Sequence, residues 1–77
     1  MDINTFLDNF ADQFDDADRG QFSPETKFRE VGGWCSIVAL SIIAMVDEEY
    51  GVTLKGDDIK GAQTVKDIFD IVTTRKD

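Results

Sequence analysis

A serine and a cysteine lie side by side at the start of the most apolar segment of the sequence. Cys35 and Ser36 follow Gly32-Gly33-Trp34, and residues 36–46, which begin at the serine, carry no charge. A serine hydroxyl at a helix start lies outside the core, next to backbone N–H groups that favour a bound phosphate. A cysteine there needs a nearby base to act as a nucleophile, and the sequence places none beside it. We therefore predict that Ser36 is either a helix cap or a modified residue, and that Cys35 is either a small, partly packed residue or a reactive thiol.

The composition excludes several kinds of site and partner. The chain has 77 residues, no histidine and one cysteine, which excludes histidine-assisted nucleophiles, imidazole metal sites, structural zinc and an internal disulfide. The net charge of −8 disfavours nucleic acids and anionic membranes and favours partners with basic patches. Residues 15–20 lack the ligand spacing of a calcium loop, so no metal site is expected. Without a signal peptide or a span long enough for a bilayer, the expected location is cytoplasmic.

Four segments with helical periodicity must position the serine. They cover residues 2–14, 36–50, 57–60 and 64–72, the last followed by a polar tail. Thr64 and Asp67 form a capping-box-like pair at the start of the last one. The aromatic stripe of the first segment, Phe6, Phe10 and Phe14, is expected in the core. The sequence thus predicts an all-α single domain over residues 1–77, a small antiparallel four-helix bundle with a short third helix.

A long loop separates the first two predicted helices. It covers residues 15–35, and loops of this length in small domains tend to be functional. Phe22, Phe28 and Val31 are expected to attach it to the core, and a short helical turn is predicted at residues 23–25. In the helix that follows, Gly51 is a typical left-handed C-cap. That helix is apolar on most of its circumference, with Ile37, Leu40 and Ala44 expected on one face and Val38, Ser41 and Met45 on the other.

The order and spacing of several motifs resemble the acyl carrier proteins. The residues that carry the resemblance are Gly33-Trp-Cys-Ser-Ile37, Leu40, Val46-Asp-Glu-Glu-Tyr-Gly-Val52 and Thr64-Val-Lys-Asp67. They match, ungapped from about Phe28 to Val72, the family's Gly-x-Asp-Ser-Leu motif, its acidic helix end followed by an aromatic residue and glycine, and its Thr-Val helix start. The resemblance implies a stand-alone, monomeric carrier that is not an enzyme. It also implies that a magnesium-dependent phosphopantetheinyl transferase attaches 4′-phosphopantetheine from coenzyme A to Ser36.

The resemblance further implies an apolar interior that shelters an acyl group held as a thioester. The expected lining residues are Ile37, Leu40, Ile43, Ala44, Val46, Ile59, Ile68 and Phe69. Acyl-loading, condensing or acyltransferase enzymes are the expected partners, docking through basic or apolar patches. The expected recognition residues are Trp34, Cys35, Ile37, Val38, Ser41, Asp47 and Glu48.

The chain departs from the family pattern beside the modified serine. Cys35 replaces the usual aspartate, Ile37 replaces leucine, and Val38 and Ser41 stand where carriers of fatty-acid synthesis often have acids. A less acidic docking face predicts a specialised lipid, polyketide or surface-polymer pathway rather than housekeeping fatty-acid synthesis. Two alternatives stay open, an unmodified acidic protein-interaction module with this fold and, third, acyl transfer through Cys35. Trp34 is either a contact for a partner or acyl chain, or simple edge packing.

Overall fold

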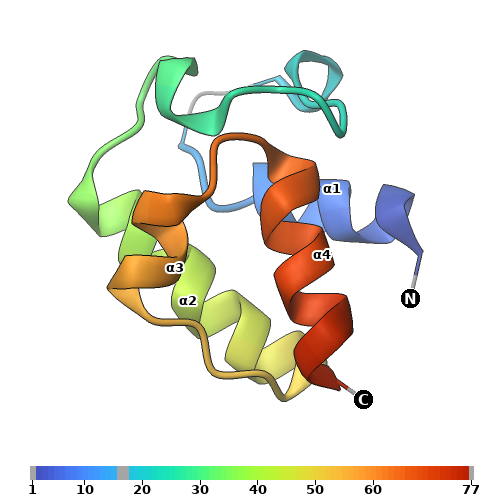
Figure 1. Cartoon of the computed structure of the whole chain (residues 1–77). Coiled ribbons are helices and arrows are strands. Elements are labelled where there is room, and N and C mark those ends of the chain that lie inside the picture. Colours follow the sequence, from blue (N-terminus) through green and yellow to red (C-terminus); the bar gives the residue numbers. More distant parts are fainter. Residues whose placement is uncertain (1, 16–17, 77) are drawn as a thin grey trace.

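The computed structural model describes residues 2–15 and 18–76. The elements are α1 (Ile3–Ala11), η1 (Arg19–Gln21), η2 (Phe28–Glu30), α2 (Ser36–Tyr50), α3 (Gly56–Gly61) and α4 (Val65–Lys76). Helices α1, α2 and α4 pack against one another, and α3 packs against α4. The predicted all-α fold with a short third helix is confirmed. Figure 1 adds that α2 and α4 run in the same direction, because the connector after α2 and then α3 carry the chain back.

Helix α1 contributes the aromatic half of the core. Asp2 caps it by accepting a hydrogen bond from the Asn4 N–H at 3.2 Å. Phe6, Phe10 and Phe14 are buried as predicted. The helix ends at Ala11 instead of residue 14, because the last turn tightens: the Phe14 N–H donates to the Ala11 carbonyl at 3.0 Å. This turn places the Phe14 ring 5.0 Å from the ring of Phe22 in the loop.

The loop between α1 and α2 is attached to the rest of the fold by buried rings and by one arginine. Phe22 and Phe28 are buried, and Val31 packs against the core, as predicted. Arg29 donates from Nη1 to the Ile59 carbonyl at 2.8 Å and from Nη2 to the Ala62 carbonyl at 2.6 Å. The loop is therefore fastened to the end of α3. The helical turn predicted at residues 23–25 is present only as a single hydrogen-bonded turn, in which the Thr26 N–H donates to the Ser23 carbonyl at 3.1 Å. The short 3-10 helices of the loop are η1 and η2.

Helix α2 has its expected bounds but the opposite orientation about its axis. It covers Ser36–Tyr50, and Gly51 has a φ of 67°, the left-handed cap that favours glycine. Its buried residues are Val38, Ile42, Met45 and Val46. Ile37 and Leu40 are 72% and 66% exposed, and Ala44 is also exposed. The two predicted faces are therefore present, but the face of Ile37, Leu40 and Ala44, expected to line the interior, is the exposed one, because apolar residues all around the helix do not indicate which side meets the core.

An ion pair joins the end of α4 to α3 in the C-terminal part of the chain. Between α2 and α3, Val52 and Leu54 are buried in an extended connector, and Ile59 of α3 points inward as predicted. The predicted capping pair is present, since the Asp67 N–H donates to Thr64 Oγ1 and the Thr64 N–H to Asp67 Oδ2. Helix α4 continues through the polar tail to Lys76, which allows Arg75 to reach α3.

The ion pair of Arg75 and Asp58 predicts a specific acid sensitivity. The Nη1 and Nη2 groups of Arg75 each donate a hydrogen bond of 2.7 Å to the Asp58 carboxylate. Together with the hydrogen bond from the Lys55 N–H, they hold the pKa of Asp58 below its ordinary value of 3.8. A pKa lower in the folded state stabilises the fold above pH 3.8 and loses this effect as pH falls further. We expect Asp58→Asn to lower the melting temperature at pH 7 and to make no difference near pH 2.

Thermal unfolding of both proteins between pH 2 and pH 7 measures this effect. Asp57→Asn is the matched control, because Asp57 is exposed and its carboxylate contacts no cation among the described residues. An Asp58→Asn melting curve parallel to that of the wild type at every pH would contradict the prediction.

Candidate functional site

Ser36 is the first residue of α2, and its side chain is exposed. The helix cap is Cys35, with an extended backbone and no side-chain hydrogen bond to the helix, so the prediction that Ser36 is the cap itself is wrong by one residue. The first intrahelical hydrogen bond runs from the Ala39 N–H to the Cys35 carbonyl at 3.1 Å. The N–H groups of the preceding turn, from Ser36 to Val38, therefore lie beside the Ser36 hydroxyl without intrahelical acceptors.

This environment fits a serine that carries a phosphodiester. The first turn of a helix presents N–H donors and the positive end of the helix dipole to an anion. Residues 36–46 add no carboxylate that would repel it. Gly33, with a φ of 92°, forms the turn that leads into α2 and leaves open space around it. The hydroxyl is therefore accessible to an enzyme that transfers a phosphate-containing group.

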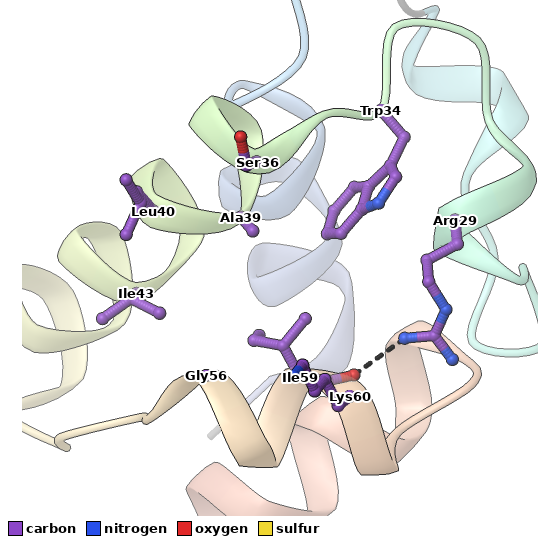
Figure 2. A pocket seen from close by; sticks show the side chains of 9 residues that line it. All are labelled: Arg29, Trp34, Ser36, Ala39, Leu40, Ile43, Gly56, Ile59 and Lys60. Carbon is purple, nitrogen blue, oxygen red and sulfur yellow. Dashed lines mark hydrogen bonds between the residues drawn. The ribbon is translucent and has the colours of Figure 1, made fainter.

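A groove begins at Ser36 and passes between α2, α3 and the loop. It has a volume of about 370 Å³, and Figure 2 shows the side chains around it. Its lining residues are Arg29, Trp34, Ser36, Ala39, Leu40, Ile43, Gly56, Ile59 and Lys60. The groove therefore offers an almost entirely apolar surface next to the Ser36 side chain.

The family comparison agrees with this site. Residues 4–72 match the model of the phosphopantetheine attachment site. The chain belongs to this family. Its members carry a covalently attached 4′-phosphopantetheine, the group that the exposed Ser36 and the free N–H groups beside it can accommodate. Comparison with curated proteins and with solved structures gives no match.

Only some of the residues that the sequence predicted for an acyl pocket line the groove of this carrier-family protein. Leu40, Ile43 and Ile59 line it. Val46 and Ile68 are fully buried in the core, and Phe69 packs against Phe6 with ring centroids 5.3 Å apart. Ile37 and Ala44 are exposed because of the orientation of α2 and do not line the groove.

Four lining residues were missed by the sequence reasoning. Arg29, Ala39, Gly56 and Lys60 line the groove without having been predicted there. The position of Ala39 in the lining could have been predicted, because it lies three residues after Ser36 and therefore on the same side of the helix. Gly56 and Lys60 had no such signal, because they belong to a segment far from Ser36 in the sequence, and Arg29 had none because it lies in the loop, which has no periodic pattern that indicates the direction of its side chains.

The predicted recognition residues divide between surface and core. Cys35, Ile37, Asp47 and Glu48 are exposed, and Ser41 is partly buried. Val38 is only 6% exposed, so it does not belong to a docking face, which is a correction to the sequence prediction. Trp34 packs its ring 5.1 Å from Phe28 and 6.0 Å from Phe14 while also lining the groove. The Trp34 side chain therefore packs at the edge of the core and also presents a surface that a ligand in the groove can contact.

Replacement of Cys35, the cap residue of α2, by aspartate is predicted to stabilise the protein. Its thiol forms no hydrogen bond to the first turn, whereas an aspartate there accepts one from a backbone N–H and faces the positive end of the dipole. We expect Cys35→Asp to raise the free energy of unfolding by about 1 kcal/mol. Urea unfolding measures the change, and Cys35→Ala is the control without a capping oxygen. Equal stability of the two variants would show that the position does not act as a cap.

Among the described residues, no group of three acidic or thiol side chains is placed to hold a metal ion. Residues 16–17 of the acidic run lie outside the described part. None of the helices that the structure describes has the length and apolarity required to cross a bilayer.

Proposed function

We propose that this protein carries acyl groups as thioesters on a 4′-phosphopantetheine arm attached to Ser36. The observation that supports this most directly is the exposed Ser36 hydroxyl at the first turn of α2, within the segment that matches the family. In the loading reaction the Ser36 oxygen bonds to the phosphorus attached to the pantetheine of coenzyme A. The diphosphate bond breaks, and 3′,5′-ADP leaves. A separate transferase supplies the magnesium and removes the hydroxyl proton.

In this proposal the protein presents a substrate and does not catalyse a reaction. The chain contains no histidine, and the residues next to Ser36 in the sequence, from Trp34 to Val38, include no carboxylate or amine that would remove its proton. Once attached, the arm supplies a terminal thiol that forms the thioester. Tethering raises the effective concentration of the acyl group at each partner's active site. The groove beside Ser36 shelters the apolar part of the acyl group between visits.

The partner enzymes dock on the exposed strip of α2, formed by Ile37, Leu40 and Ala44 and ending at the acids Asp47 and Glu48. Exposed apolar patches often mark interaction surfaces. The strip suits a partner surface that is apolar near the active site and basic farther away, as expected for a dedicated lipid, polyketide or surface-polymer pathway.

A charge placed next to this strip, at Ser41, tests how partners recognise it. Ser41→Glu adds an acid to a partly exposed position without entering the core. We expect it to accelerate loading by a transferase with a basic docking patch about 2- to 5-fold at low salt, and to lose that advantage at high salt. Ser23→Glu, in the loop, is the matched control. An equal rate increase in both variants would indicate a general charge effect instead of docking.

Intact-mass measurement after incubation with coenzyme A, magnesium and a broad-specificity transferase tests the proposed function. We expect the gain of one phosphopantetheinyl group, its loss in Ser36→Ala and its retention in Ser41→Ala, a serine on the same helix. Circular dichroism confirms that both variants fold. No mass gain in the folded wild type would instead favour the interaction module. In a parallel incubation with an acyl-coenzyme A and no transferase, acylation that persists in Ser36→Ala and disappears in Cys35→Ala would favour direct transfer, in which the Cys35 thiol displaces coenzyme A from its thioester.

A further inference from the structure

The groove beside Ser36 has an almost entirely apolar surface, although two of its lining residues are cationic. Both Nη groups of Arg29 are bound to backbone carbonyls, those of Ile59 and Ala62. Long cationic side chains cover apolar surface with their methylene groups while the charged end stays in water, and Lys60 is exposed. A polar substituent on an acyl group would therefore lose its contacts with water in the groove without gaining a protein partner.

The two ends of the groove differ. In Figure 2, Leu40 lies at one end, and Trp34 lies at the other, beside Arg29. Leu40 is 66% exposed, so its end of the groove opens to solvent. The six-membered ring of the Trp34 indole extends toward Ala39 and Ile59, while its nitrogen lies on the side toward Arg29. The hydrocarbon part of the indole thus forms the wall of the groove on the side of the loop.

The Trp34 side chain is held in place by the aromatic core. Its ring centroid lies 5.1 Å from that of Phe28 and 6.0 Å from that of Phe14, and both phenylalanines are buried. The Trp34 N–H donates to the Val31 carbonyl at 3.2 Å. Arg29 lies over the same Phe28 ring, with its guanidinium carbon 5.0 Å from the centroid. The indole would have to leave these contacts to turn away from the groove, so it forms a fixed wall.

We propose that Trp34 determines the longest acyl chain that the groove takes up, and that this chain is an unsubstituted alkyl group. This inference rests on the proposed function, because the acyl group reaches the groove through the arm on Ser36. Methylene groups that fit between Leu40 and the indole leave water and stabilise the folded protein, whereas those in excess stay in water and add nothing. A smaller side chain at residue 34 would extend the groove, whose volume is about 370 Å³, toward Phe14 and Phe28.

A series of acyl chains measures this limit. The transferase loads the protein from coenzyme A thioesters with butanoyl- to hexadecanoyl-pantetheine in steps of two carbons, and intact mass verifies loading. We expect the melting temperature, relative to the form with an unacylated arm, to rise by about 2–4 °C per step up to a limiting length and then to level off. Trp34 is the only tryptophan, so its emission should shift with chain length up to the same limit. The adipoyl group, which ends in a carboxylate, should stabilise the protein less than the hexanoyl group.

Two variants of Trp34 test its role in setting the limit. Trp34→Ala should move the limiting length to longer chains by at least about one step of the series, and Trp34→Phe, which keeps a ring against Phe28, should move it less. Trp34→Phe decides the test if Trp34→Ala does not fold. Phe69→Ala is the matched control, because Phe69 is a partly buried aromatic residue outside the groove lining. It should lower the stability of the protein and leave the limiting length unchanged.

Each limiting length is measured against the unacylated form of the same variant, so that the stability change caused by the substitution itself cancels. The same limit in the wild type and the folded Trp34 variants, an equal change of the limit in Phe69→Ala, or a melting temperature independent of chain length would overturn the role of Trp34. Equal stabilisation by the adipoyl and hexanoyl groups would overturn the preference for an alkyl chain. These outcomes leave the carrier function intact, whereas failure of the wild type to accept any acyl-pantetheinyl group would overturn the proposed function.

Discussion

Val38→Glu is expected to leave most of the protein unfolded, whereas Ile37→Glu should fold. The two residues are neighbours in the first turn of α2, yet Val38 is 6% exposed and Ile37 is 72% exposed. A glutamate at the Val38 position brings a carboxylate into the core, where no described side chain is placed to pair with it. We expect a loss of about 4 kcal/mol or more, which is a large part of the stability of a domain of this size.

Urea unfolding and circular dichroism at pH 7 measure both variants, and Ile37→Glu is the matched control because it introduces the same charge one position away. Its stability should change by less than about 1 kcal/mol. If Val38→Glu were as stable as Ile37→Glu, the orientation of α2 would be wrong. Val38→Glu therefore does not test the docking face, because it would abolish loading by unfolding the protein.

The sequence predicted most reliably those elements whose apolar residues occupy one side. The stripe of Phe6, Phe10 and Phe14 has polar residues opposite it, so its direction toward the core was predictable. In α2 the bounds were predictable from the serine-containing motif and Gly51, but the buried face was not. Tertiary contacts select that face, and the helices that α2 packs against, α1 and α4, lie elsewhere in the sequence.

The functional site shows the same division between local and distant information. The position of Ser36 at a helix start followed from its neighbours in the chain, with an error of one residue in the cap. The groove also depends on Arg29, which lies 30 and 33 positions before the two carbonyls that it binds. The fold of the loop brings Arg29 to these two carbonyls at the end of α3, and no local sequence pattern indicates this contact.

Phe10→Ala is expected to cause the second largest loss of stability, about 3–5 kcal/mol. The Phe10 side chain is fully buried, and its ring centroid lies within 6.1 Å of those of Phe6, Phe14, Phe22 and Phe28. These rings belong to α1 and to both halves of the loop that leads to Ser36. Removing the central ring leaves a cavity among side chains that the remaining aromatic groups cannot fill.

Phe69→Ala is the control for this prediction, because Phe69 is only partly buried and has a single aromatic neighbour, Phe6. Its loss of stability, measured by urea unfolding, should be clearly smaller. Phe28 also carries the Trp34 ring, 5.1 Å away, so disturbance of the Phe10 cluster should reach the groove as a change in Trp34 fluorescence. A Phe10→Ala variant with native stability and an unchanged spectrum would show that the loop is held in place without the Phe10 ring.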